Sequence, residues 1–168
     1  MAGYPGAKPA FTFKVSIGAP IAIGSAARST PLQVVPMLGG SFQSAEGFDL
    51  PIDAEFVGVG NDYIHADADG GRLRLNAHGV IKTKDEALIY LNYTGIVTLT
   101  DAETAVFTGT ASEGSTPWGN SFIHVTFETG HERYKDLENR VFVGQGRFNV
   151  GADKKVTVEY HVGQVVHG

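Results

Sequence analysis

Three stretches of the chain place polar and titratable side chains at every second position. They are Arg74, Asn76 and His78, then Tyr90, Asn92 and Thr94, and later His124, Thr126 and Glu128. Successive side chains of a β-strand point to opposite faces, so each trio shares one face of its strand. Imidazole, phenol, guanidinium and carboxylate groups can donate hydrogen bonds or move protons during a reaction. The trios therefore form either the solvent-exposed outer surface of a barrel or the lining of a polar pocket inside it.

The same alternation of apolar and polar residues recurs along the chain and predicts the strands that carry these groups. Strands are expected at residues 11–17, 32–35, 39–43, 53–59, 73–82, 88–100, 105–110, 122–128, 141–148 and 156–162. Turn residues rich in Gly and Asp separate these runs, which is typical of an antiparallel barrel or sandwich. Residues 131–139 are the one expected helix, and the Gly- and Pro-rich residues 1–10 are expected to form a loose arm.

Length, charge and cysteine content exclude several classes of protein. A chain of 168 residues predicts one domain over residues 1–168. The net charge is −5 and the basic residues are scattered, so nucleic-acid binding is not expected. No apolar run is as long as a membrane span, and we expect a cytoplasmic protein that does not bind membranes. The absence of cysteine excludes disulfides, thiol nucleophiles and thiolate metal sites.

The sequence predicts neither a metal nor a cofactor. The six histidines are not spaced as metal-ligand pairs on one element. Residues 67–70 begin like a calcium loop, but His78 occupies the position that needs a bidentate Glu, so a hairpin turn is expected there. There is no alternation of strands and helices to form a dinucleotide crevice, and no Gly-x-Ser-x-Gly elbow for acyl transfer.

Several motifs resemble, in order, those of domain-of-unknown-function family three-two-three-seven. They lie at residues 34–42, 60–63, 77–83, 87–90 with Gly95, 127–130 (Phe-Glu-Thr-Gly) and 134–144. The resemblance implies a closed antiparallel β-barrel of the lipocalin or calycin type, and a homodimer. Asp62 matches a usual aspartate, whereas Asn76 and His78 replace an acidic residue and an arginine. Such departures at polar positions imply a ligand that differs from those of most relatives.

The resemblance also extends to fungal barrels of secondary-metabolite biosynthesis, which implies a cofactor-independent cyclase or isomerase of the pericyclase type. A hetero-Diels–Alder cycloaddition, for example, needs two reactants held in near-attack geometry and a hydrogen bond to the heterodiene. The partner would be a small, hydrophobic, partly oxygenated organic substrate bound inside the barrel. Two alternatives remain: a carrier barrel that binds such a molecule without turnover, and a structural barrel filled by its own side chains.

The hypothesis assigns roles to thirteen residues. The expected catalytic residues are His78, Tyr90, Arg74 and Glu128. The expected substrate-binding residues are Asp62, Tyr63, His65, Asn76, Asn92, Trp118, Phe122, His124 and Phe142. Asp62 and His65 are expected on opposite faces of their strand, since they are three residues apart. Trp118, in a turn-rich connection, is expected to plug a barrel mouth or to stack on a ligand.

Overall fold

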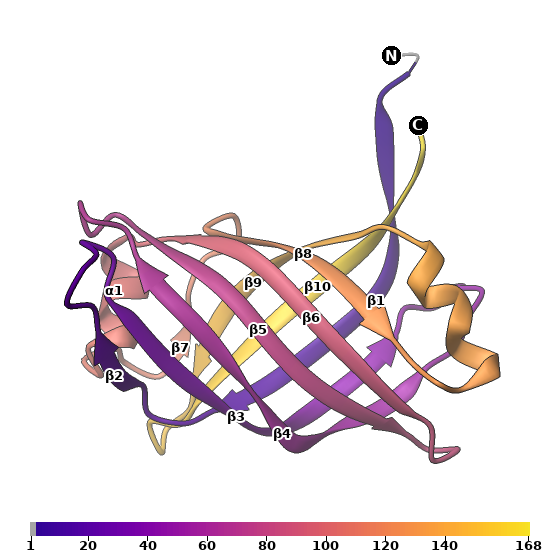
Figure 1. The fold of residues 1–168 in the computed structure, drawn as a ribbon, viewed down its shortest axis with the longest axis horizontal. Helices are drawn as coiled ribbons and strands as arrows, with labels where there is room; N and C mark the ends of the chain where they lie inside the picture. Colours follow the sequence, from indigo (N-terminus) through magenta and orange to yellow (C-terminus); the bar gives the residue numbers. More distant parts are fainter. Residues whose placement is uncertain (1–2) are drawn as a thin grey trace.

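Eight antiparallel strands close into a barrel, and two short strands lie beside it (Figure 1). The structure is a computed structural model that describes residues 3–168. Its strands are β1 (Pro5–Ile17), β2 (Ile21–Gly24), β3 (Leu32–Ser44), β4 (Asp53–Ala66), β5 (Arg72–Thr83), β6 (Leu88–Thr98), β7 (Gly114–Ser115), β8 (Ser121–Glu128), β9 (Phe142–Val150) and β10 (Val156–His167). The order β1-β10-β9-β8-β6-β5-β4-β3 is closed by pairing of β3 with β1. The predicted closed antiparallel barrel is therefore confirmed.

The closing pair of strands depends on a glycine. Gly40 of β3 lies opposite Val15 of β1 and has a φ of 150°. A Cβ atom at this position would be only 1.9 Å from the carbonyl oxygen of Lys14. In the same pairing, residues 37–39 of β3 lie opposite residues 16 and 17 of β1, and this β-bulge adds local twist of the kind that a closed barrel requires.

The two ends of the chain form a ribbon that stands clear of the barrel (Figure 1). Residues 5–9 of β1 pair with residues 163–167 of β10 beyond the point where β1 leaves β3. The prediction of a loose arm over residues 1–10 is therefore wrong for residues 5–10, because they belong to β1 and residues 5–9 pair with β10. Residues 1 and 2 lie outside the described part of the chain.

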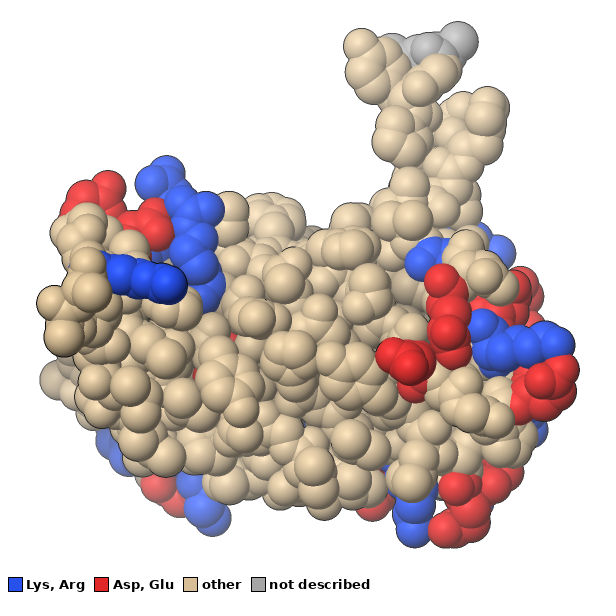
Figure 2. Space-filling model, in the orientation of Figure 1, with Lys and Arg blue, Asp and Glu red and all other residues tan. Residues whose placement is uncertain are grey.

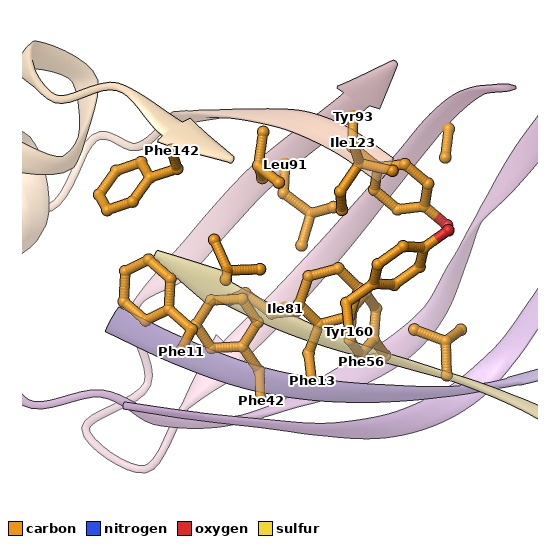
Figure 3. Close-up of a cluster of buried hydrophobic side chains, with 14 of the residues drawn as sticks. Phe11, Phe13, Phe42, Phe56, Ile81, Leu91, Tyr93, Ile123, Phe142 and Tyr160 are labelled. Atoms are coloured by element: carbon orange, nitrogen blue, oxygen red, sulfur yellow. The ribbon is translucent and has the colours of Figure 1, made fainter. Parts of the chain in front are cut away.

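Aromatic side chains fill the interior of the barrel (Figure 3). Phe11 packs against Phe42 at 4.9 Å between ring centroids, and Phe13 packs against Tyr160 at 5.1 Å. Aromatic pairs of this kind contribute about 0.5–1.5 kcal/mol each beyond the burial of their area. Because most inward positions of the barrel strands are apolar, the barrel is a packed core over most of its length.

Two short helices lie at opposite ends of the barrel (Figure 1). The 3₁₀ helix η1 (Glu132–Asn139) coincides with the helix expected at residues 131–139, and it buries Tyr134 and Leu137. The helix α1 (Asp101–Phe107) is a correction, since residues 105–110 were expected to form a strand. Its start is a capping box: the Thr100 hydroxyl accepts a hydrogen bond from a backbone N–H of the first turn, and the Glu103 carboxylate accepts one from Thr100 N–H.

The turn between β4 and β5 is the hairpin expected at residues 67–70. Gly70 N–H donates to the Asp67 carbonyl oxygen, and Gly71 N–H donates to the Asp69 carboxylate.

Within residues 3–168, no group of three or more His, Asp or Glu side chains is arranged to hold a metal ion. In the same part of the chain, no helix is long and apolar enough to cross a membrane.

Candidate functional site

The three polar trios lie on the outer surface of the barrel. The residues between them on β5, β6 and β8, such as Ala77, Tyr93 and Val125, are buried in the core. The interpretation that the trios line a polar pocket inside the barrel is therefore wrong, and the interpretation as its solvent-exposed outer surface is right. The physical reason is that the alternate positions of these strands carry the larger apolar side chains, which must face the interior.

Two of the expected catalytic residues are brought together on this outer face. His78 Nδ1 lies 2.6 Å from the Tyr90 hydroxyl, within hydrogen-bond distance. The two rings are roughly parallel, with centroids 6.0 Å apart, and the Tyr63 ring meets His78 edge-on at 6.1 Å. An imidazole hydrogen-bonded to a phenol can relay a proton or present one polarised donor to a ligand.

The other polar candidates near this pair are held by the strands. Asn92 donates from its side-chain amide to the Asn76 side-chain oxygen at 3.1 Å and to the Ala77 carbonyl oxygen at 2.8 Å. Glu128 is exposed and lies beside Tyr90 in a shallow groove of about 600 Å³. These residues surround His78 and Tyr90, although none of them bonds to either side chain in the described part of the chain.

A larger groove of about 1040 Å³ crosses the outer faces of β5, β6, β8, β9 and β10. One row of paired outward residues across it is Arg74, Ile96, Phe122, Gln145 and His161. The next row is Thr94, His124, Val143 and Gly163. Ile96, Phe122 and Val143 expose apolar surface in the middle of the groove, and nitrogen donors stand around them. The groove thus joins three of the predicted site residues: Arg74, Phe122 and His124.

On two sides of this groove, Arg74 and His161 already have partners within the protein. Arg74 forms a bidentate pair with Asp67, with N···O distances of 2.9 and 2.8 Å, and this hydrogen bonding lowers the pKa of Asp67. At the other side, the Trp118 ring lies 4.6 Å from His161 and 4.6 Å from the Arg147 guanidinium. Trp118 is therefore stacked on the outside, and its expected role as a plug of the barrel mouth is wrong.

His65 also lies on the outer face, opposite Arg74. Asp62 is buried, so the prediction that Asp62 and His65 lie on opposite faces of β4 is confirmed. Figure 2 shows that charged side chains gather at the two ends of the viewed face, whereas its middle, over β4, β5, β6 and β8, is almost free of them. A neutral, partly apolar surface of this kind favours an uncharged ligand.

The barrel interior has room for little more than one water molecule. Its cavity measures about 20 Å³ and lies at the α1 end, where Phe107 forms part of the wall. Phe142, expected to line a ligand pocket, is fully buried in the aromatic core. The expectation of a substrate inside the barrel therefore fails for the closed structure, which matches the alternative of a barrel filled by its own side chains.

Three titratable groups, Asp62, Tyr93 and Tyr160, face the interior cavity. Asp62 is 8 % exposed, and its Oδ1 accepts a hydrogen bond of 3.0 Å from the backbone N–H of Asn76. Burial raises the pKa of Asp62 to about 7, against the lowering effect of that hydrogen bond. Tyr93 and Tyr160 line the same cavity, and burial raises the pKa of both hydroxyls.

Comparison with protein families identifies the chain. A family model described as "Protein of unknown function (DUF3237)" matches residues 5–165. The chain belongs to the DUF3237 family. This confirms the resemblance deduced from the sequence motifs. No protein with a curated description matches this DUF3237 chain.

Solved structures from bacteria and a fungus are similar in fold to this DUF3237 chain. A conserved protein of unknown function from Rhodopseudomonas palustris superposes with a TM-score of 0.80 at 23 % identity, over 98 % of this chain and 100 % of the other. A β-barrel-like protein from Acinetobacter baumannii gives 0.73 at 21 % identity, over 99 % of both chains. A structure described as an enzyme from Penicillium herquei gives 0.61 at 17 % identity, over 96 % and 97 %. These similarities establish the fold.

Sequence reasoning missed three residues of the DUF3237 barrel that belong to these sites. Tyr93 and Tyr160 stand among the apolar positions of their strands, and a tyrosine on a buried face brings a hydroxyl that needs a partner. His161 alternates with Val158, Tyr160 and Val162, and that alternation could have placed it on the outer face. Its closeness to Trp118 depends on a connection of irregular conformation, which periodicity does not describe.

Proposed function

We propose that this DUF3237 protein binds a small, hydrophobic, partly oxygenated organic molecule in the outer groove. In this proposal the protein acts on that molecule as a cofactor-independent cyclase or isomerase of the pericyclase type. The observation that carries the proposal is the combination of exposed Ile96, Phe122 and Val143 with the nitrogen donors of His124 and His161 in one groove of about 1040 Å³. That volume matches the upper end of drug-sized ligand pockets.

The apolar middle of the groove would hold the carbon skeleton of the substrate, and His124 would donate a hydrogen bond to a carbonyl oxygen. Such a donor withdraws electron density from a heterodiene and lowers the barrier to ring closure. Holding two reacting ends in near-attack geometry contributes further, up to about 7–11 kcal/mol in favourable cases. A ring closure of this type forms new carbon bonds from π bonds and needs no electron donor.

The distant relative described as an enzyme supports catalysis by such a barrel, since it shares the fold over 96 % of this chain. Its reaction is not transferred to this protein on 17 % identity. The groove is open, so a bound molecule would stay in contact with water. This feature is equally compatible with the alternative function, a carrier that binds the molecule without turnover. Turnover therefore decides between the two functions.

The test is incubation of the purified protein with candidate polyketide and terpene precursors, followed by chiral chromatography of the products. A change in rate or stereochemistry is expected, and His124→Ala should reduce the rate about tenfold or more. Thr126→Ala, on the same outer face of β8 but outside the groove, is the matched control. Tight stoichiometric binding without product would support the carrier, and absence of binding in the groove would refute both.

The roles assigned to His78 and Tyr90 stay predictions of the same proposal. If His78→Ala and Tyr90→Phe both leave an established activity within twofold, neither residue is catalytic. The homodimer and the cytoplasmic location also stay predictions. Light scattering after size-exclusion chromatography tests the first, and fractionation of cells that express the protein tests the second.

A further inference from the structure

The α1 end of the barrel interior contains polar atoms that the groove does not use. Asp62 projects from β4, Tyr93 from β6 and Tyr160 from β10 toward one small cavity of about 20 Å³. Figure 3 shows the hydroxyl groups of Tyr93 and Tyr160 pointing toward one another at one end of the aromatic cluster. The remaining lining is apolar and includes Met37 and Phe107.

The hydrogen bonding of this cluster is incomplete. Asp62 is more than nine-tenths buried, and only its Oδ1 has a hydrogen-bond partner, the Asn76 N–H, within residues 3–168. The Tyr160 hydroxyl lies 3.4 Å from Ser121 Oγ, whereas the Tyr93 hydroxyl has no hydrogen-bond partner in the described part of the chain. No fully buried side-chain nitrogen or oxygen within residues 3–168 lacks a partner, so the unbonded oxygens of Asp62 and Tyr93 face space that a water-sized molecule can enter.

We propose that this cavity is an internal binding site for a small cyclic molecule with one hydroxyl or carbonyl oxygen, which Asp62 and Tyr93 hold by hydrogen bonds. The apolar walls accept the ring, and the ligand oxygen lies between the carboxyl and the phenol. A buried carboxylic acid beside a tyrosine in an apolar pocket suits a phenolic or enolic oxygen, since both groups can donate to it. Burial keeps a large fraction of Asp62 protonated near neutral pH, which supports this arrangement.

Entry of such a ligand requires movement of Phe107, because 20 Å³ holds no ring. Phe107 is the last residue of the seven-residue helix α1, and its ring contacts Phe148 edge-on at 5.2 Å. α1 lies at the end of the barrel and not within its wall, so displacement of Phe107 breaks no strand pairing (Figure 1). This internal site is separate from the outer groove, and it can exist whether or not the groove binds a substrate.

The chain provides its own reporter for the test. It has two methionines, and Met37 lines the cavity while Met1 is at the chain start. Protein labelled with ¹³C at the methionine methyl groups is titrated with phenol and, separately, with toluene, which has nearly the same shape without the oxygen. Phenol should shift the Met37 methyl resonance in a saturable way and leave Met1 unchanged.

Variants separate the polar site from a merely apolar hole. Tyr93→Phe and Asp62→Asn should each weaken phenol binding at least fivefold without changing toluene binding, and Thr126→Ala should change neither. Phe107→Ala should strengthen phenol binding by opening the cavity. The proposal is overturned if Met37 responds in neither the native protein nor Phe107→Ala. It is also overturned if phenol and toluene bind equally, or if Tyr93→Phe, which keeps the ring, binds phenol like the native protein.

Discussion

The carboxyl of Asp62 should make the stability of the barrel depend on pH in a way that one substitution removes. Its pKa is about 7 in the folded protein and about 3.8 when exposed in the unfolded chain. Between these values the folded state binds the extra proton, so the free energy of unfolding falls as the pH rises and becomes constant above about pH 7. From pH 5 to pH 8 this loss amounts to about 3 kcal/mol for a single such group.

Asp62→Asn keeps the shape of the side chain but cannot ionise. We expect the variant to gain about 3 kcal/mol relative to the native protein between pH 5 and pH 8, measured by urea unfolding at each pH. The comparison cancels the contributions of histidines and other groups that both proteins share. Asp67→Asn is the control, because the pKa of Asp67 is lowered by Arg74 and its effect should be constant over this range. If the difference between native protein and Asp62→Asn is independent of pH, the Asp62 carboxyl is already ionised at pH 5 and the reasoning is refuted.

Three further substitutions test how the site is supported. Gly146→Ala would put a Cβ atom 2.4 Å from the Tyr160 ring and should lower the free energy of unfolding by about 1–3 kcal/mol in chemical denaturation; an unchanged midpoint would mean that the ring has room to move. Thr100→Ala removes the cap of α1 and should cost about 0.5–2 kcal/mol, with faster amide exchange in α1 only. Arg147→Met removes a charge-assisted hydrogen bond to Glu159, which keeps Asn149 and Lys14 as partners, and should cost about 1.5–3 kcal/mol; a thermal unfolding temperature no lower than that of the native protein would contradict this.

The sequence predicted most strands and the barrel because alternation of apolar residues follows directly from the strand period of two. It also contained the information that decides which face is buried. Leu91 and Tyr93 on β6 alternate with Asn92 and Thr94, and the larger apolar set belongs to the core. The hypothesis of an internal polar pocket placed the polar residues on the inner face, which is wrong. It considered which residues could react and did not compare the apolar area of the two faces.

Other parts depended on signals that a search for alternation overlooks. The capping box of Thr100 and Glu103 marks the start of α1, although residues 105–110 also alternate. The pairing that orders residues 5–9 lies at the far end of the chain, in β10, so no local pattern announces it. The approach of the Tyr93 and Tyr160 hydroxyls likewise depends on the packing of two strands, β6 and β10, whose tyrosines are 67 positions apart in the sequence.

Inward and outward residues alternate along the barrel strands, so the outer surface can change in sequence without a change in the core. Ile96, Phe122 and His124 project outward, while Ile123 and Val125 beside them belong to the core. The outward residues are not part of the aromatic packing, so under the proposed function different residues of the same strands would determine ligand preference and thermodynamic stability. Relatives with 17–23 % identity can thus retain one architecture while each presents its own surface chemistry.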